Sequence, residues 1–380
     1  MAETIISSAK TVVSPTEGDG SLGREVRGDA AWDEARELEE LESAELNLAE
    51  LDLEALEEKA LADMEQVERN EAPPDGTAEL EELEELGADQ EYGFLYGPIE
   101  GNTLDRKMNS FVPNEFLRLM GKKSVMDLRL GDHIKREMTI LFSDIRQFTE
   151  MFESISLEEG FRFINSYFTR VVPVINQYGG FVDKYIGDAI MAIFPQSNGA
   201  DMAVRASVEI QKRFREYNKH RARSGYRPLS LGIGIHTGTI ILGVVGTHDR
   251  MQNTVISDAV NLASRIEGLT KTFGVSMAIS GQTFRKLEHP EKYIFRYLGN
   301  VRVRGKIDPT SVYEILNGID DELKEKKMRT TRNFEQGLFS FALRKYAEAL
   351  DNFTSVLNVL PEDRASAIYS NRCQEHLKGA

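Results

Sequence analysis

The sequence predicts an α+β domain in which helices cover a mainly antiparallel sheet, with helical extensions at the N- and C-terminal ends. Three observations support this fold class. Apolar segments of strand length alternate with longer segments in which apolar residues recur every three or four positions. The segment 181–194 reads as two strands around a tight turn, which favours antiparallel pairing. Both ends of the chain are polar and rich in helix-forming residues.

Residues 1–104 are predicted to form an acidic arm that is partly helical and partly disordered. The formal charge of the chain is −16, but residues 29–91 contain 25 Asp or Glu and only 3 Lys or Arg, so they carry −22 and the rest carries +6. A helix is expected over 32–69 because Glu, Leu and Ala dominate there. The positive balance of the remaining chain can attract a polyphosphate.

Residues 105–135 are predicted to link this arm to a core at 136–317. The first core strand ends at Asp144, and a helix follows that is expected to bend at Pro173 and to end at Gly179 and Gly180. The apolar positions of that helix are Phe161, Ile164, Phe168, Val171 and Ile175. Further strands are predicted within 181–194, as a pair at 229–238 and 239–246, and at 275–280, 293–302 and 311–316, with helices at 199–219 and 257–271.

The C-terminal segment 318–380 is predicted to be helical. Its pattern over 333–361 resembles a tetratricopeptide unit and the start of another. That is fewer repeats than a free-standing array needs, so we expect this segment to dock on the core, on another subunit or on a partner protein.

Composition excludes several classes of protein. The single cysteine, Cys373, rules out an intramolecular disulfide and fits a reducing compartment. No apolar run is long enough to span a bilayer, and the first residues lack the basic start and apolar core of a signal peptide. We therefore expect a cytoplasmic protein with no membrane span, and no feature of the sequence predicts binding to nucleic acid.

Two aspartates, Asp144 and Asp188, stand in apolar strand-like settings. A carboxylate at the end of a buried strand is costly unless a cation or hydrogen bonds compensate it, and two converging carboxylates repel each other unless a metal lies between them. Magnesium suits such a place because it accepts one or two carboxylates and completes its octahedron with water and phosphate oxygens. Each Asp alone could merely end a strand or cap a helix.

Four motifs in order make residues 136–316 resemble the catalytic domain of the class III adenylyl and guanylyl cyclases. The motifs are LFSDIRQFT at 141–149, GGFVDKYIGD at 179–188, GIHTG at 234–238 and TVISDAVNLASR at 254–265. The resemblance implies a ferredoxin-like core and the conversion of a nucleoside triphosphate to a cyclic nucleotide. It also implies two Mg²⁺ or Mn²⁺ ions per site, held by Asp144, Asp188 and the backbone carbonyl of Ile145.

The same resemblance assigns the other site residues. Asn261 would orient the ribose, and Arg265, four residues later on one helix, would meet the charge that grows at the α-phosphate. Lys184 and Thr254 would select the base, because a lysine donor and a hydroxyl acceptor complement the edge of adenine. The weaker motif VRGK at 303–306 would place Arg304 and Lys306 on the terminal phosphates.

Two positions depart from the family pattern, and a histidine within one motif needs an interpretation of its own. Ser257 stands where a glycine is usual, which could alter the loop, and Gly232 stands where many relatives have a cation that contacts phosphate. His236 is interpreted as a packed turn residue, because no second histidine or cysteine accompanies it.

In this family one catalytic domain supplies the aspartates and a second supplies the Lys, Thr, Asn and Arg, so the resemblance implies a homodimer with ATP as substrate. The sequence therefore predicts an adenylate cyclase that makes 3',5'-cyclic AMP and pyrophosphate in intracellular signalling. A guanylate cyclase is disfavoured by Lys184, and a catalytically silent nucleotide-binding scaffold is disfavoured by the intact metal and arginine positions. The diguanylate cyclase signature is absent from the sequence. The acidic arm or the C-terminal helices could bind a protein partner.

Overall fold

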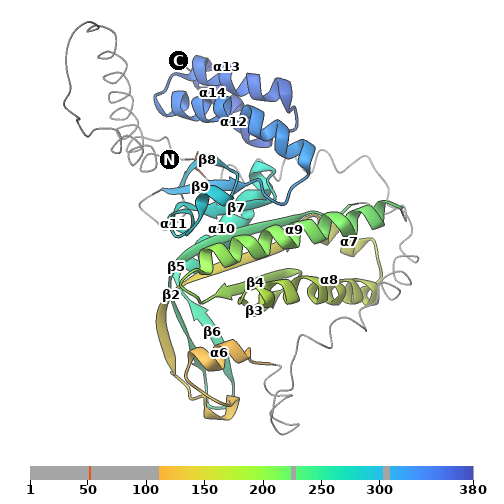
Figure 1. The fold of residues 1–380 in the computed structure, drawn as a ribbon, viewed down its shortest axis with the longest axis vertical. Helices are drawn as coiled ribbons and strands as arrows, with labels where there is room; N and C mark the ends of the chain where they lie inside the picture. Colours follow the sequence, from red (N-terminus) through yellow and green to blue (C-terminus); the bar gives the residue numbers. More distant parts are fainter. Residues whose placement is uncertain (1–50, 53–110, 224–227, 303–308, 380) are drawn as a thin grey trace, which may run out of the picture.

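The computed structural model describes residues 51–52, 111–223, 228–302 and 309–379 (Figure 1). These residues form one sheet with the strand order β1-β8-β9-β7-β5-β2-β4-β3, and β6 pairs with β5. The strands are β1 Leu51–Asp52, β2 His133–Ile145, β3 Phe181–Ile186, β4 Ala189–Phe194, β5 Leu231–Gly246, β6 Met251–Ile256, β7 Met277–Ser280, β8 Phe295–Arg302 and β9 Thr310–Ile315. Only the β1–β8 and β5–β7 pairs are parallel, which confirms the predicted mainly antiparallel α+β class.

The centre of the sheet is the antiparallel pair β2–β5, in register from His133 opposite Gly243 to Ile145 opposite Leu231. The prediction of two separate strands at 229–238 and 239–246 is wrong, because a single strand, β5, runs unbroken through both segments. Gly238 suggested a turn but is extended, and a Cβ there would lie 2.9 Å from the Cβ of Ala259. The glycine thus admits a neighbouring helix instead of turning the chain, and His236 lies within a strand and not in the expected turn.

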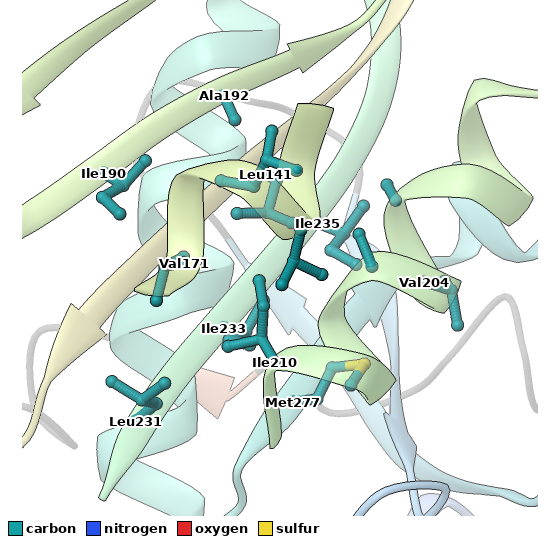
Figure 2. Packing of buried hydrophobic residues seen from close by; sticks show 14 of the residues in the cluster. Leu141, Val171, Ile190, Ala192, Val204, Ile210, Leu231, Ile233, Ile235 and Met277 are labelled. Carbon is teal, nitrogen blue, oxygen red and sulfur yellow. The ribbon is translucent and has the colours of Figure 1, made fainter. Parts of the chain in front are cut away.

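Two helices, α8 (Leu157–Gln177) and α9 (Gly199–Arg223), cover one face of the sheet (Figure 1). The alternate β2 and β5 residues that point toward them, such as Leu141 and Ile235, pack with helix residues such as Val171 and Val204 (Figure 2). The helix α8 starts with a capping box in which Ser156 and Glu159 bond each other's backbone N–H groups. The packing of α8 and α9 against the sheet forms the largest of three buried apolar clusters among the described residues.

The predicted apolar face of α8 is partly wrong. Phe161 is 69% exposed, whereas Phe163 and Tyr167 are buried. The two phenylalanines are two positions apart, so apolar spacing alone did not distinguish the buried one from the exposed one. The helix continues through Pro173, and Gly179 follows its C-terminal end with a φ of 75°.

The opposite face of the sheet is covered by α10 (Asp258–Phe273) and the short helix α6 (Asn114–Leu119). The short helices α7 (Phe148–Glu153) and α11 (Gly281–Arg285) instead pack Phe148 and Phe284 against the apolar cluster of α8 and α9. The helix α10 lies very close to β5, because a Cβ on Gly234 would be 2.1 Å from the backbone nitrogen of Glu267. Only glycine permits this approach. The even-numbered β2 residues Met138, Ile140 and Phe142 form a separate apolar cluster on this side with Ala259 and Ala263.

Three C-terminal helices dock on the core, which is one of the predicted alternatives. They are α12 (Asp321–Ala342), α13 (Tyr346–Val359) and α14 (Arg364–Lys378). Phe334, Phe353 and Tyr369 share one buried cluster with Leu262 of α10 and Leu298 of β8. The resemblance to a tetratricopeptide unit stays a prediction.

A buried ion network joins this segment to the sheet. The guanidinium of Arg296 on β8 is fully buried and lies 2.8 Å from Asp363 and 3.0 Å from Glu314. Lys327 on α12 pairs with the other oxygen of Glu314, so two positive and two negative groups balance. Burial would raise the pKa of Asp363, but the charge and hydrogen bonds of Arg296 bring that pKa below its usual value.

The expected helix over 32–69 lies outside the described residues except for Leu51 and Asp52, which form a strand paired with β8 and so contradict the prediction at these two positions. No helix in the described parts of the chain is long and apolar enough to cross a membrane. The domain limits at 104, 135 and 317 stay predictions.

Replacing Arg296 with Met should lower the free energy of unfolding by about 3–5 kcal/mol, because Asp363 is left buried without its counter-ion. Urea unfolding followed by circular dichroism measures this change. The matched control is Arg329→Met on α12, whose exposed pair with Glu325 is expected to contribute less than about 1 kcal/mol. Equal losses in the two variants would contradict the role given to the buried network.

Candidate active site

The two predicted metal ligands lie side by side at one end of the central strands. Asp144 is the penultimate residue of β2, and Asp188 sits in the two-residue turn that joins β3 to β4. Gly187 precedes it with a φ of 63°, a conformation that a tight hairpin turn requires and that glycine adopts without strain. The turn therefore holds Asp188 against the end of β2.

The carboxyl groups of Asp144 and Asp188 affect each other directly. Burial raises the pKa of Asp188, and the hydrogen bond and charge of Asp144 raise it further. The backbone N–H of Ile145 donates to Asp188 Oδ2 at 3.2 Å and acts in the opposite direction. Two carboxyl groups in such contact require either a shared proton or a cation.

The donor set suits a divalent metal of the magnesium type. Both side chains are half-buried and offer hard oxygen atoms. Among the described residues no group of three or more His, Cys, Asp or Glu side chains forms a metal cluster, so water and substrate oxygens would have to complete the coordination. That pattern is typical of Mg²⁺ bound together with a nucleotide.

A pocket of about 810 Å³ opens beside the aspartates. The loop from Asp144 to Glu150, the start of β5, the C-terminal end of α10 and Arg364 of α14 line it. A volume of this size is typical of small-molecule sites. Basic side chains in its lining are Arg146, Lys271 and Arg364, and acidic ones other than the two aspartates include Glu150.

The predicted base-selecting residues are in contact. Lys184 on β3 donates from Nζ to Thr254 Oγ1 on β6 at 3.5 Å. The same ammonium lies 3.2 Å from Asp183, whose side chain is fully buried. Burial raises the pKa of Asp183, while Lys184 and a hydrogen bond from Asn253 lower it. The structure thus brings together two residues that are 70 positions apart in the sequence.

Asn261 and Arg265 lie one turn apart on α10, away from its buried residues Leu262 and Ile266. Asn261 is exposed and Arg265 is half-buried. Ser257 caps the helix by accepting from the N–H of Ala259, and its φ of −176° is ordinary extended backbone, so the serine replaces the usual glycine without strain. Its hydroxyl also donates to the carbonyl of Thr239 at 2.6 Å.

The structure does not bring the two sets of predicted residues into one pocket. None of Lys184, Thr254, Asn261 and Arg265 is among the described residues that line the cavity beside Asp144 and Asp188. Arg304 and Lys306 lie outside the described residues. The described chain therefore carries two separate halves of the predicted site.

Gly232 stands at the position where many members of the resembled family have a positively charged residue. It lies opposite Asp144 in the β2–β5 register. The guanidinium of Arg146 fills its space, since a Cβ on Gly232 would be 1.9 Å from Arg146 Nη2. Arg146 lies 3.5 Å from Glu267, and burial raises the pKa of Glu267 to about 7 although Arg146 lowers it. His236 is buried and bonded to Ser280 at 2.8 Å, which fits a packing role.

Comparison with known proteins decides the family. The model of the adenylate and guanylate cyclase catalytic domain matches residues 132–317. Residues 132–317 of this chain therefore form an adenylate and guanylate cyclase catalytic domain. Divalent metal ions are generally used by these enzymes, in agreement with the paired aspartates of the cyclase domain.

Two curated relatives are adenylate cyclases. The adenylate cyclase of Anabaena cylindrica is 41% identical over 225 residues, which is 57% of this chain and 45% of that protein. The terminal-differentiation specific adenylate cyclase of Dictyostelium discoideum is 36% identical over 278 residues, which is 72% of this chain and 13% of that protein. The chain thus spans less than half the length of either relative.

Solved structures of cyclases are also similar. The adenylyl cyclase CyaB from P. aeruginosa is 28% identical, with 50% of this chain and 96% of that chain covered and a TM-score of 0.44. The guanylyl cyclase Cya2 is 32% identical, with 50% and 95% covered and a TM-score of 0.43.

Several residues near the site were missed by the sequence analysis. Asp183 and Asn253 each adjoin a predicted residue, so their proximity in sequence was an available signal. Arg146 lies in the first metal motif, but its packing over Gly232 depends on the pairing of β2 with β5. Lys271 and Arg364 carry no local signal, because only the docking of α10 and α14 places them at the cyclase domain's pocket.

Replacing Asp188 with Asn should abolish stabilisation of the protein by Mn²⁺, because one of two hard oxygen ligands loses its charge. In metal-free buffer the same variant should melt at a higher temperature than the wild type, since it removes the repulsion from Asp144. Melting curves with and without Mn²⁺ measure both effects. Glu137→Gln is the control, because Glu137 pairs with Lys286 outside this pocket. An unchanged response to Mn²⁺ in Asp188→Asn would rule out the metal role.

Proposed function

We propose that this protein is an adenylate cyclase that converts ATP to 3',5'-cyclic AMP and pyrophosphate at the interface of a homodimer. The observation that carries the proposal is the contact between Lys184 and Thr254 in a cyclase domain whose Asp144 and Asp188 converge. The assignment of ATP as the substrate also rests on two named relatives, both of which are adenylate cyclases. A cytoplasmic location is part of the same proposal.

The reaction is an in-line displacement at the α-phosphorus. The ribose 3'-oxygen forms a bond to phosphorus as the bond to the bridging oxygen of the β-phosphate breaks, and the hydroxyl proton is released. Asn261 would hold the ribose so that its hydroxyl faces the phosphorus. Arg265 would donate to the phosphoryl oxygens, where negative charge accumulates in the transition state.

Asp144, Asp188 and the carbonyl of Ile145 would hold the divalent metal ions, proposed to be two Mg²⁺ or Mn²⁺ per site. When bound, these ions supply positive charge that favours ionisation of the ribose hydroxyl and neutralises the leaving pyrophosphate. The aspartates contribute by fixing that charge at one edge of the sheet. Their mutual repulsion in the absence of metal favours its uptake.

Base selection would come from Lys184 and Thr254. The ammonium of Lys184 can donate to N1 of adenine, and the Thr254 hydroxyl can accept from the N6 amino group. Asp183 is buried beside Lys184 and limits the directions in which the ammonium can point. Guanine presents a donor at N1, which an ammonium cannot pair with.

A second copy of this chain would complete each site. Apolar side chains are exposed on the strands around the Lys184–Thr254 contact, although such side chains are usually buried. They are Tyr185 and Ile186 on β3, Ile241 and Val245 on β5, and Met251 and Ile256 on β6. Pairing of two copies through this surface would cover these residues and place the aspartates of one copy beside Asn261 and Arg265 of the other.

The composite site predicts complementation between inactive variants. Asp144→Asn and Arg265→Ala should each lower cyclic AMP formation about 100-fold or more when purified alone. Coexpression should restore about a quarter of wild-type activity, because half of the dimers formed at random are mixed and each has one intact site. Mass detection of cyclic AMP from ATP and Mn²⁺ measures this.

Complementation separates the proposal from its alternatives. Coexpressed protein that stays as inactive as each variant would contradict the shared site. A wild-type protein that makes cyclic GMP as its dominant product when ATP and GTP are supplied separately would contradict the substrate. A wild type that is as inactive as the two variants, as a dimer and with several metals, would favour a silent scaffold.

Substitutions at Lys184 test base selection. Lys184→Gln should lower kcat/KM for ATP about tenfold, because one hydrogen bond to the base weakens. Lys184→Glu should lower it further and raise the ratio of GTP to ATP turnover, because a carboxylate accepts from guanine. The control is Lys212→Glu on the exposed side of α9, which makes the same charge change. An unchanged GTP to ATP ratio in Lys184→Glu would refute this assignment.

A further inference from the structure

The pocket beside Asp144 and Asp188 includes a side chain from outside the family's catalytic domain. Arg364 is the first residue of α14, whereas the family match ends at residue 317. It lines the pocket together with the loop that carries Asp144 and with Lys271 near the end of α10. The C-terminal helices therefore do more than cover the apolar surface of α10 and β8.

The preceding residue fixes the position of Arg364. Asp363 caps α14 by accepting from the N–H of Ser366 at 3.1 Å. Its two carboxylate oxygens also accept from the guanidinium of Arg296, at 2.8 and 3.1 Å. Such a bidentate pair has a defined geometry, so the backbone at the start of α14 is held to the sheet.

The stem of Arg364 packs on the C-terminal end of α10. Gly274 ends that helix with a φ of 64°, and a Cβ there would lie 2.9 Å from Arg364 Cδ. A larger residue at 274 would therefore displace the arginine. Glycine at this position serves two purposes, because it adopts the left-handed conformation and leaves room for the stem.

The pocket gathers positive side chains beside the two aspartates. Arg146 and Arg364 both line it, and Glu267 lies 3.5 Å from Arg146. Lys271 adds a third positive group, and Glu150 adds a negative one at the pocket wall. An anion between the two guanidinium groups would relieve their repulsion.

We propose that Arg364 binds the terminal phosphates of the nucleoside triphosphate, so that the C-terminal helices form part of the substrate site. Arg146 occupies the space over Gly232 and would act with Arg364 in the same pocket. The inference rests on the proposed function for the identity of the substrate. Its chemistry, a polyphosphate held by two guanidinium groups beside a metal site, can be measured without turnover.

Binding of inorganic tripolyphosphate tests this role directly. Isothermal titration of the full chain with tripolyphosphate and Mg²⁺ should give an affinity that Arg364→Ala weakens about tenfold or more, because a charge-assisted contact is lost. Arg364→Lys should retain part of the affinity. Arg372→Ala, on the same helix but not among the described pocket residues, should bind as the wild type does. Melting curves check that each variant is folded.

Turnover provides a second measurement. Arg364→Ala should raise KM for ATP about tenfold and change kcat less, since the terminal phosphates are bound before and during reaction. Inhibition by pyrophosphate should weaken in parallel. Loss of kcat without a change in KM would indicate a structural effect on the metal loop and would overturn the proposal.

The proposed function and the inference about Arg364 can be refuted independently of each other. A wild type that forms cyclic AMP while Arg364→Ala binds tripolyphosphate normally would overturn this inference and leave the proposed function intact. A wild type that forms no cyclic nucleotide but binds tripolyphosphate through Arg364 would overturn the proposed function and leave the polyphosphate site. Absence of tripolyphosphate binding by the wild type would also overturn the inference.

Discussion

The rest of the structure depends on the antiparallel pairing of β2 with β5. Thirteen consecutive residue pairs place Asp144 opposite Gly232 and bring the metal loop against the start of β5. On the same strand Gly234 allows the backbone of α10 to approach, and the far half of β5 pairs with β6, which carries Thr254. A one-residue shift in this register would turn Asp144 to the other face of the sheet relative to β5. Both halves of the candidate site therefore depend on one ladder of backbone hydrogen bonds.

That ladder also explains why the aspartates can be held in an unfavourable arrangement. Two adjacent carboxyl groups, partly shielded from water, destabilise the folded protein unless a cation or a proton compensates them. The strand and the tight turn at Gly187 keep them together because the surrounding core over-determines their position. In the proposed site this negative charge would bind metal, and in its absence it does not add stability. The buried network around Arg296 differs in this respect, because its opposite charges are balanced within the chain.

Local patterns predicted much of the fold and the separate parts of the site. The strand that carries Asp144 near its end and the helix that carries Asn261 and Arg265 follow from apolar periodicity, which is a property of neighbouring residues. The division of β5 was predicted wrongly because an extended glycine required for helix packing looks like a turn glycine in the sequence. The Lys184–Thr254 contact was inferred only through resemblance, and its support from Asp183 was missed. Arg364 could not be found at all, because its position depends on how a distant helix docks.

The way in which α14 docks has a consequence for control of the pocket. Replacing a buried ion network by apolar side chains often costs no stability, so the Arg296 network is not explained by stability alone. Unlike apolar contacts, the bidentate contact to Asp363 defines one orientation for the start of α14. A small shift of the C-terminal helices would therefore be transmitted to Arg364 through a single peptide bond, without a change in the sheet.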